Sequence, residues 1–196
     1  MKTVYVDFDN TIVESNHRVI EILNERYGLS KTEDDLVDYG YKSIAPITEE
    51  EKLSIFSSDD FFSNLRFKSD FLKVLNKYSD KVKFIITTKG TEENLKKKKE
   101  WVKDNIPCDI GFVGITNDSL SKKQVDMSDG IQIDDCTAAL DTNASLKILY
   151  KDNHNFSWQS DYSNTDIMVV NNWKEIDEII SFYSTYDYKT LSKKGE

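Results

Sequence analysis

The stretch Thr3-Val-Tyr-Val-Asp-Phe-Asp-Asn-Thr11 decides the fold, because a short apolar run ends there in two carboxylates. Its valines are β-branched and its tyrosine is aromatic, so the run predicts a strand. A nearly unbroken apolar strand is typical of a parallel sheet that is buried on both faces. Asp7 then stands where the strand leaves the core, at the edge where open α/β sheets bind their ligands.

Asp7 and Asp9 lie on the same side of an extended chain, with Phe8 on the opposite side. Two carboxylates held so close repel each other unless a metal ion compensates them or one keeps a proton. The alternative is a solvated turn, since Asp and Asn are common turn residues. The segment indicates a functional site, and further motifs along the chain are needed to distinguish a functional site from a solvated turn.

The chain has 196 residues, with 35 acidic and 26 basic side chains and a net charge of −9. This length predicts one domain, or one domain with a sizeable insertion. The acidic balance argues against a nucleic acid polymer as partner, because that needs a basic surface. It does not argue against a small anion held by a local cluster.

Cys108 and Cys136 form no paired motif, so we expect reduced thiols, with a disulfide as the less favoured alternative. No basic segment precedes an apolar one at the N-terminus, and no apolar run approaches the length of a membrane span. We therefore expect a cytoplasmic protein without a membrane partner. The oligomeric state is left open, with a homodimer among the alternatives.

Apolar runs that predict strands alternate with stretches of helical spacing along most of the chain. Strands are expected near 3–7, 82–88, 110–115, 130–135, 146–150 and 167–170, and helices near 19–27, 91–104 and 173–182. This order predicts an α/β fold with a Rossmann-like parallel sheet flanked by helices. Residues 15–74 interrupt the alternation, so they are interpreted as a small helical cap inserted after the first strand of a core domain of residues 1–14 and 75–196.

Polar groups also stand at two further strands. Thr87 and Thr88 close the strand near 82–88, where hydroxyls and backbone N–H groups can donate to an anion. Lys122 and Lys123 precede the strand near 130–135, and a lysine is a point charge suited to a phosphoryl oxygen. Each group has a plain structural alternative, a strand end for the threonines and a solvated surface for the lysines.

Asp134 and Asp135 directly follow an apolar strand. Adjacent acids there are costly unless they are solvated or bound to a cation, and hard oxygen ligands beside a phosphate site favour Mg²⁺. Because the carboxyl ends of parallel strands share one edge, we expect all these groups to converge. A carboxylate nucleophile, a second carboxylate, hydroxyl donors, a cation and a metal pair fit phosphoryl transfer.

These residues resemble the four motifs of the haloacid dehalogenase superfamily, in their usual order. The motifs are Asp7-Phe-Asp9-Asn-Thr11, Thr87, Lys123 and Asp134-Asp135. The resemblance narrows to the 5′-nucleotidase C family, the 5′(3′)-deoxyribonucleotidases. The supporting stretches are Asp59-Asp-Phe-Phe-Ser-Asn-Leu65, Phe84-Ile-Ile-Thr-Thr88, Ile131-Gln-Ile-Asp-Asp135, Tyr150-Lys-Asp-Asn-His-Asn155 and Val170-Asn-Asn-Trp173.

The resemblance implies a phosphoric monoester hydrolase that acts on nucleoside 5′-monophosphates. Asp7 would attack phosphorus to form an aspartyl-phosphate, and Asp9 would act as general acid and then as general base. One Mg²⁺ would bind between Asp7, the backbone carbonyl of Asp9 and the pair Asp134 and Asp135. Which of that pair binds the metal directly stays open.

The phosphoryl oxygens would be held by three side chains, Thr87, Thr88 and Lys123, with Lys122 as the alternative lysine. The chain also departs from the family pattern at three places. The Thr88-Lys-Gly90 stretch lacks a proline often found there, Cys136 replaces a common arginine, and Ser15 falls near a position that is aromatic in some members. These departures leave the preferred nucleotide open.

The cap is expected to choose the substrate. Tyr39 and Tyr41 flank a glycine in a predicted loop, so they are the candidates to stack on a nucleobase. The lysine run 96–99 is interpreted as a solvated helix face, and the cap core is expected to hold Phe61, Phe62 and Phe67. The alternatives to a nucleotide phosphatase are a phosphatase of another small ester, such as a sugar phosphate, and a non-catalytic phosphate-binding regulatory domain.

Overall fold

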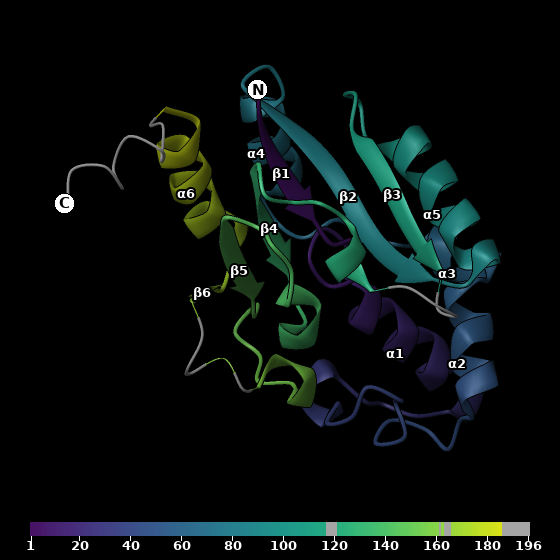
Figure 1. The fold of residues 1–196 in the computed structure, drawn as a ribbon. Helices are drawn as coiled ribbons and strands as arrows, with labels where there is room; N and C mark the ends of the chain where they lie inside the picture. The colour runs from purple at the N-terminus through teal and green to yellow at the C-terminus, as the bar shows by residue number, and fades with distance from the viewer. Residues whose placement is uncertain (117–120, 161, 163–165, 186–196) are drawn as a thin grey trace.

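Six parallel strands form one sheet in the order β3-β2-β1-β4-β5-β6 (Figure 1). The strands are β1 (Lys2–Val6), β2 (Val82–Gly90), β3 (Gly111–Thr116), β4 (Gly130–Asp134), β5 (Leu146–Tyr150) and β6 (Ile167–Val170). The computed structural model describes residues 1–116, 121–160, 162 and 166–185. The predicted fold class is confirmed, because a parallel sheet with helices carries a small helical insertion after its first strand.

Strand β1 lies in the centre of the sheet because its apolar side chains are buried on both faces. Val4 and Val6 are fully buried, and Val6 pairs with Ile86 of β2 and with Ile133 of β4. The backbone N–H of Asp7 then donates to the carbonyl of Ile133 at 2.9 Å. The register therefore brings Asp7 alongside the end of β4, where the second acidic pair begins.

Three helices of the core accompany the sheet: α4 (Phe71–Tyr78), α5 (Glu92–Asn105) and α6 (Trp173–Thr185). Helix α5 packs on β2 and β3, and α4 packs on α6. Single turns η2 (Lys122–Gln124), η3 (Thr137–Leu140) and η4 (Ser157–Gln159) lie in the connections after β3, β4 and β5. Of the helices that the structure describes, none is both long and apolar enough to cross a membrane.

The remaining helices lie between β1 and α4 in the chain, at the end of the sheet toward which the β1 and β2 arrowheads point (Figure 1). They are α1 (Ser15–Tyr27), the turn η1 (Glu33–Asp35), α2 (Glu49–Phe56) and α3 (Asp59–Ser63). Gly28 ends α1 in a left-handed conformation with a φ of 64°, and the Thr48 side chain caps α2 by accepting from the Glu51 N–H. The cap boundaries at residues 14/15 and 74/75 stay a prediction.

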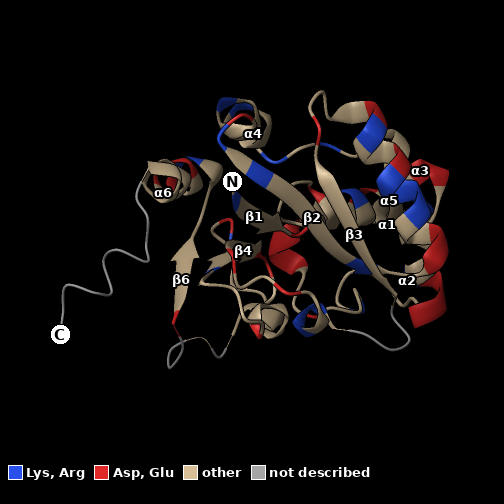
Figure 2. Cartoon of the chain, turned by 45° about the horizontal axis from the view of Figure 1, so that its top comes forward, with Lys and Arg blue, Asp and Glu red and all other residues tan. Residues whose placement is uncertain are grey.

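An ion pair connects this cap to the core, because Lys97 Nζ of α5 lies 2.6 Å from Asp59 Oδ1 of α3. Figure 2 shows the basic residues of α5 in blue and the acidic residues of α2 and α3 in red. The opposite charges of these helices therefore favour the observed docking of cap on core.

The loop after β1 is folded back on itself and fixed from a distant part of the chain. The carbonyl of the fully buried Phe8 accepts from the N–H groups of Ile12 and Val13, and Asn10 adopts a left-handed φ of 53°. The indole Nε1 of Trp173, at the start of α6, donates to the carbonyl of Thr11 at 2.8 Å. The C-terminal helix thus holds the loop that carries Asp7 and Asp9.

Candidate active site

The ends of β1 and β4 bring three carboxylates together. Asp7, Asp134 and Asp135 are all buried, and each offers an oxygen within 4.8 Å of the other two. Burial raises the pKa of Asp7 to about 7, with Asp134 and Asp9 adding to the rise and Lys122 opposing it. Burial and the neighbouring carboxylates also hold the pKa of Asp135 well above its usual range.

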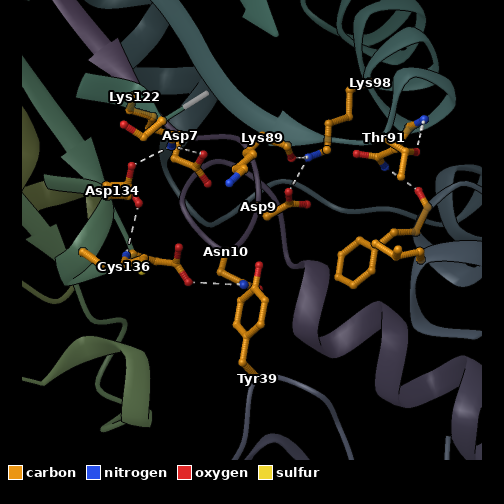
Figure 3. A pocket seen from close by; sticks show the side chains of 18 of the residues that line it. Asp7, Asp9, Asn10, Tyr39, Lys89, Thr91, Lys98, Lys122, Asp134 and Cys136 are labelled. Carbon is orange, nitrogen blue, oxygen red and sulfur yellow. Dashed lines mark hydrogen bonds and ion pairs between the residues drawn. The ribbon is translucent and has the colours of Figure 1, made fainter. Parts of the chain in front are cut away.

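Lys122 is the cation of this cluster. Its Nζ donates to Asp7 Oδ1 at 2.5 Å and to Asp134 Oδ2 at 2.6 Å (Figure 3). Burial alone would lower the pKa of Lys122, but the Asp134 and Asp7 carboxylates outweigh it and raise that pKa. Lys123, the residue that the motif order favoured, is exposed and pairs with Asp141. The geometry therefore favours Lys122, because the turn η2 directs only the first of the two lysines to the carboxylates.

Asp9 has surroundings of its own. The Ser15 hydroxyl donates to Asp9 Oδ1 at 2.7 Å, and Lys98 Nζ donates to Asp9 Oδ2. Lys98 Nζ also reaches the Thr88 hydroxyl at 2.9 Å and the Lys89 carbonyl at 3.1 Å. The carboxylate that follows Asp7 by two residues is therefore fixed between the first residue of cap helix α1 and core helix α5.

The interpretation of residues 96–99 as a solvated helix face is wrong for Lys98. Its side chain is 1% exposed, whereas Lys96 and Lys99 are exposed and Lys97 pairs with Asp59. Residues three and four positions apart share one face of a helix. Because α5 buries Trp101, Lys98, three residues earlier, lies on the same buried face. The Asp9 carboxylate, the Thr88 hydroxyl and the Lys89 carbonyl accept hydrogen bonds from Lys98 and stabilise this inward position.

Thr87 and Thr88 lie inside β2, which continues two residues beyond them to Gly90. Both threonines are fully buried. The Thr88 hydroxyl is used by Lys98, while the hydroxyls of Thr87 and Thr11 have no hydrogen-bond partner among the described residues. A buried hydroxyl without a partner is unusual, but neither threonine is among the residues that line the cavity beside the acidic cluster.

A cavity of about 740 Å³ opens between these core residues and the cap. Tyr39 and Tyr41 both line it, but they differ in exposure. Tyr39 is 66% exposed and its ring packs edge-on against Trp158, with the ring centroids 5.6 Å apart. Tyr41 is buried and its hydroxyl donates to Asn16 Oδ1 at 2.6 Å. Of the two predicted stacking residues, Tyr39 is thus the more exposed, although Lys52 Nζ lies over its ring at 4.5 Å from the centroid.

Asn16 is a cap residue that sequence reasoning missed. It lines the cavity and is 2% exposed, with its backbone N–H donating to Asn10 Oδ1 at 2.7 Å. Its Oδ1 accepts from Tyr41, and its Nδ2 group has no partner among the described residues. Nothing in the sequence distinguishes this asparagine from a helix-cap residue, so only the fold could reveal an unused donor here.

The residues present fit a divalent cation of the hard type. Lys122 pairs with two of the three buried carboxylates, Asp7 and Asp134, so negative charge exceeds positive charge in the cluster. The raised pKa values of Asp7 and Asp135 reflect that excess. All three ligand atoms are carboxylate oxygens, which suits Mg²⁺ better than softer metals. The fold thus assembles carboxylates, a lysine and unpaired hydroxyls at one edge, a set that can bind and transfer a phosphoryl group.

A sequence profile matches residues 1–185 of the chain, and its description is "5′ nucleotidase, deoxy (Pyrimidine), cytosolic type C protein". The chain belongs to this family. The predicted family and the predicted class of enzyme, a phosphatase of the 5′-nucleotidase family, are both confirmed. A comparison with curated proteins found no match to this chain.

Solved structures extend the likeness of this 5′-nucleotidase family member to the haloacid dehalogenase fold. A haloacid dehalogenase-like hydrolase from Streptococcus pneumoniae is 15% identical with a TM-score of 0.61, over 93% of this chain and 98% of that one. The hydrolase YfnB from Bacillus subtilis is 12% identical with a TM-score of 0.59, over 91% and 98%. That structure contains bound magnesium. At such identities the likeness concerns the fold alone.

Proposed function

We propose that this protein hydrolyses nucleoside 5′-monophosphates, deoxyribonucleotides among them, with Asp7 as nucleophile and Asp9 as general acid and base. The observation that carries the proposal is the different surroundings of the two carboxylates. Asp7 is buried beside Lys122 and two further acids, whereas Asp9 is held by Ser15 and Lys98. Neighbouring carboxylates in different environments are suited to separate roles in one reaction.

In the first step a carboxylate oxygen of Asp7 attacks phosphorus and the bond from phosphorus to the ester oxygen breaks. Asp9 gives its proton to the departing alkoxide, which is otherwise a poor leaving group. Lys122 holds a phosphoryl oxygen, and the unpartnered hydroxyl of Thr87 is available to donate to another. In this role Lys122 replaces the lysine that the motif order favoured.

In the second step water attacks the phosphorus of the aspartyl-phosphate. Asp9 takes a proton from that water, the bond between phosphorus and the Asp7 oxygen breaks, and inorganic phosphate leaves. Both residues then return to their starting protonation states. General acid–base help of this kind contributes roughly 10²–10⁴-fold.

Asp7, Asp134 and Asp135 would hold Mg²⁺, with the backbone carbonyl of Asp9 as a further ligand. When bound, the ion lowers the repulsion between the phosphate and the nucleophile. The charge excess of the cluster supports a divalent ion, since the lysine alone leaves it negative. Thermal unfolding with and without Mg²⁺ tests this part separately from turnover, because an ion that binds the folded state raises Tm.

Two features of the cap side support a nucleotide rather than another ester. Tyr39 is largely exposed, and Asn16 offers one unused donor. The cavity lining is rich in charged and polar groups, but it also includes the apolar side chains of Leu53 and Phe56, which can contact a base or sugar. We further propose that the protein acts in the cytoplasm on a free nucleotide, and a homodimer remains an untested alternative to a monomer.

The decisive experiment measures release of inorganic phosphate from a panel of nucleoside 5′-monophosphates and sugar phosphates in the presence of Mg²⁺. We expect nucleotides to be favoured, and Asp7→Asn to lose at least about 10⁴-fold in kcat. Asp141→Asn, which removes a carboxylate at the cavity rim, serves as matched control. Equal rates on sugar phosphates would remove the nucleotide assignment, and phosphate release by Asp7→Asn at the wild-type rate would remove the catalytic one.

A further inference from the structure

One oxygen of Asp135 is fixed by two donors from outside the acidic cluster. Asp135 Oδ2 accepts from the indole Nε1 of Trp158 at 3.0 Å and from Asn10 Nδ2 at 3.3 Å (the latter contact is drawn in Figure 3). A carboxylate oxygen that receives two hydrogen bonds is held in direction and has little remaining capacity. The other oxygen, Oδ1, receives no such hydrogen bond among the described residues and is available to a cation.

Trp158 is itself held by two other aromatic rings. Phe156 stacks on it with ring centroids 4.5 Å apart and an interplanar angle of 7°, and Tyr39 of the cap packs edge-on against it at 5.6 Å. Its turn η4 is tied to the end of β5, because Gln159 Nε2 donates to the Tyr150 carbonyl at 3.3 Å. The indole therefore has a fixed orientation set jointly by the core and the cap.

We infer that Trp158 is the positioning residue of the metal site: its indole N–H fixes Asp135 in the orientation that binds a divalent cation. The inference rests on the metal part of the proposed function. Donors to a ligating carboxylate contribute about 10- to 100-fold in metal affinity when they are removed one at a time. Because Tyr39 of the cap packs against the same indole, the cap also stabilises the orientation of Asp135 through Trp158.

The test measures Mg²⁺ affinity of the purified full-length chain by isothermal titration calorimetry, without substrate. Trp158→Phe keeps an aromatic ring between Phe156 and Tyr39 but removes the donor. We expect its Kd for Mg²⁺ to rise about 10- to 100-fold. Trp101→Phe is the matched control, since Trp101 packs on Phe8 and Phe67 rather than on Asp135, and its Kd should stay within about threefold of wild type.

A second readout places the tryptophan beside the ion. Tb³⁺ in place of Mg²⁺ should show emission sensitised by excitation that only tryptophan absorbs, and this emission should be lost in Trp158→Phe but kept in Trp101→Phe. If Trp158→Phe does not fold, Trp158→His replaces it, because the imidazole N–H restores a donor at this position. The expected Kd of that variant lies closer to wild type than to Asp135→Ala.

The outcomes separate the inference from the proposed function. A Kd for Mg²⁺ in Trp158→Phe within about threefold of wild type would overturn the positioning role while leaving the metal site intact. Absence of Mg²⁺ binding by the wild type itself would overturn the metal part of the proposed function. Wild-type binding that weakens in Trp158→Phe and not in Trp101→Phe supports both.

Discussion

The core wall and the cap wall of the cavity differ in how their polar groups are paired. On the core wall, Asp7, Asp9 and Asp134 each contact a buried lysine, Lys122 or Lys98. On the cap wall the Asn16 amide nitrogen has no partner among the described residues, and Tyr39 exposes most of its ring. The charged groups of the core wall are thus already paired, whereas the cap wall keeps an amide donor and ring surface that a ligand could contact.

This contrast predicts that changes to the core wall alter chemistry and folding, and changes to the cap wall alter selectivity. The largest effect should appear in stability, because the core wall concentrates buried charge. The folded pKa of Asp7 is about 7 against an ordinary value of 3.8, so between these values the unfolded chain binds fewer protons than the folded one. The free energy of unfolding of the metal-free protein should therefore fall as pH rises from about 4 to about 7.

Asp7→Asn should remove this fall, since the amide cannot ionise. The variant should be more stable than the metal-free wild type above pH 7, by at most about 4 kcal/mol, and close to it in stability near pH 3. Urea unfolding in the presence of a chelator, repeated across this pH range, measures the difference. A constant difference at all pH values would contradict the buried-charge explanation.

The second comparison uses the adjacent lysines of η2. Lys122→Met should lower kcat/KM by about 10²–10³-fold, because it removes a donor placed for the phosphoryl oxygens and leaves Asp7 and Asp134 without their cation. Lys123→Met should change kcat/KM by less than about threefold, since Lys123 is exposed and pairs with Asp141. Steady-state kinetics on one nucleotide measures both losses. Equal losses would contradict a special role for Lys122, and a larger loss in Lys123→Met would favour the lysine that the motif order predicted.

The lysine run of α5 offers a matched pair in the same way. Lys98→Met should lower kcat by about 10²-fold, because Asp9 loses the contact that sets its position. Lys97→Met removes only a surface ion pair to Asp59 and should change the free energy of unfolding by less than about 1 kcal/mol. The kinetic and the unfolding measurements are made on both variants, and a kcat loss shared by Lys97→Met would argue against a special role for Lys98.

The smallest effect is expected on the cap wall. Asn16→Leu removes the unused donor with little change in volume, so the ratio of kcat/KM for a nucleotide to that for phenyl phosphate should fall about tenfold. Tyr41→Phe, which frees the Asn16 carbonyl oxygen, should lower the same ratio by less. Competition between the two substrates measures the ratio directly. An unchanged ratio in Asn16→Leu would mean that the nucleoside does not use this donor.

The strands and the polar groups at their ends could be predicted because short-range pattern sets both. The β-branched run before Asp7 and the one before Asp134 each define a strand, and parallel pairing then brings the strand ends together. Lys98 could not be predicted, since a charged residue in a lysine run has the same local pattern whether it is buried or solvated. Trp158 lies on a turn just outside the supporting stretch 150–155, and its contact with Asp135 depends on how the segment after β5 returns to the site.

The hydrogen bond from Trp173 to the Thr11 carbonyl sets the order in which the site can be finished during synthesis. Residues 1–11 are synthesised well before the helix that holds their loop, which begins at residue 173. Nascent chains that have not reached this residue lack the contact to the loop between Asp9 and Val13. The loop therefore acquires this support only after α6 has been made.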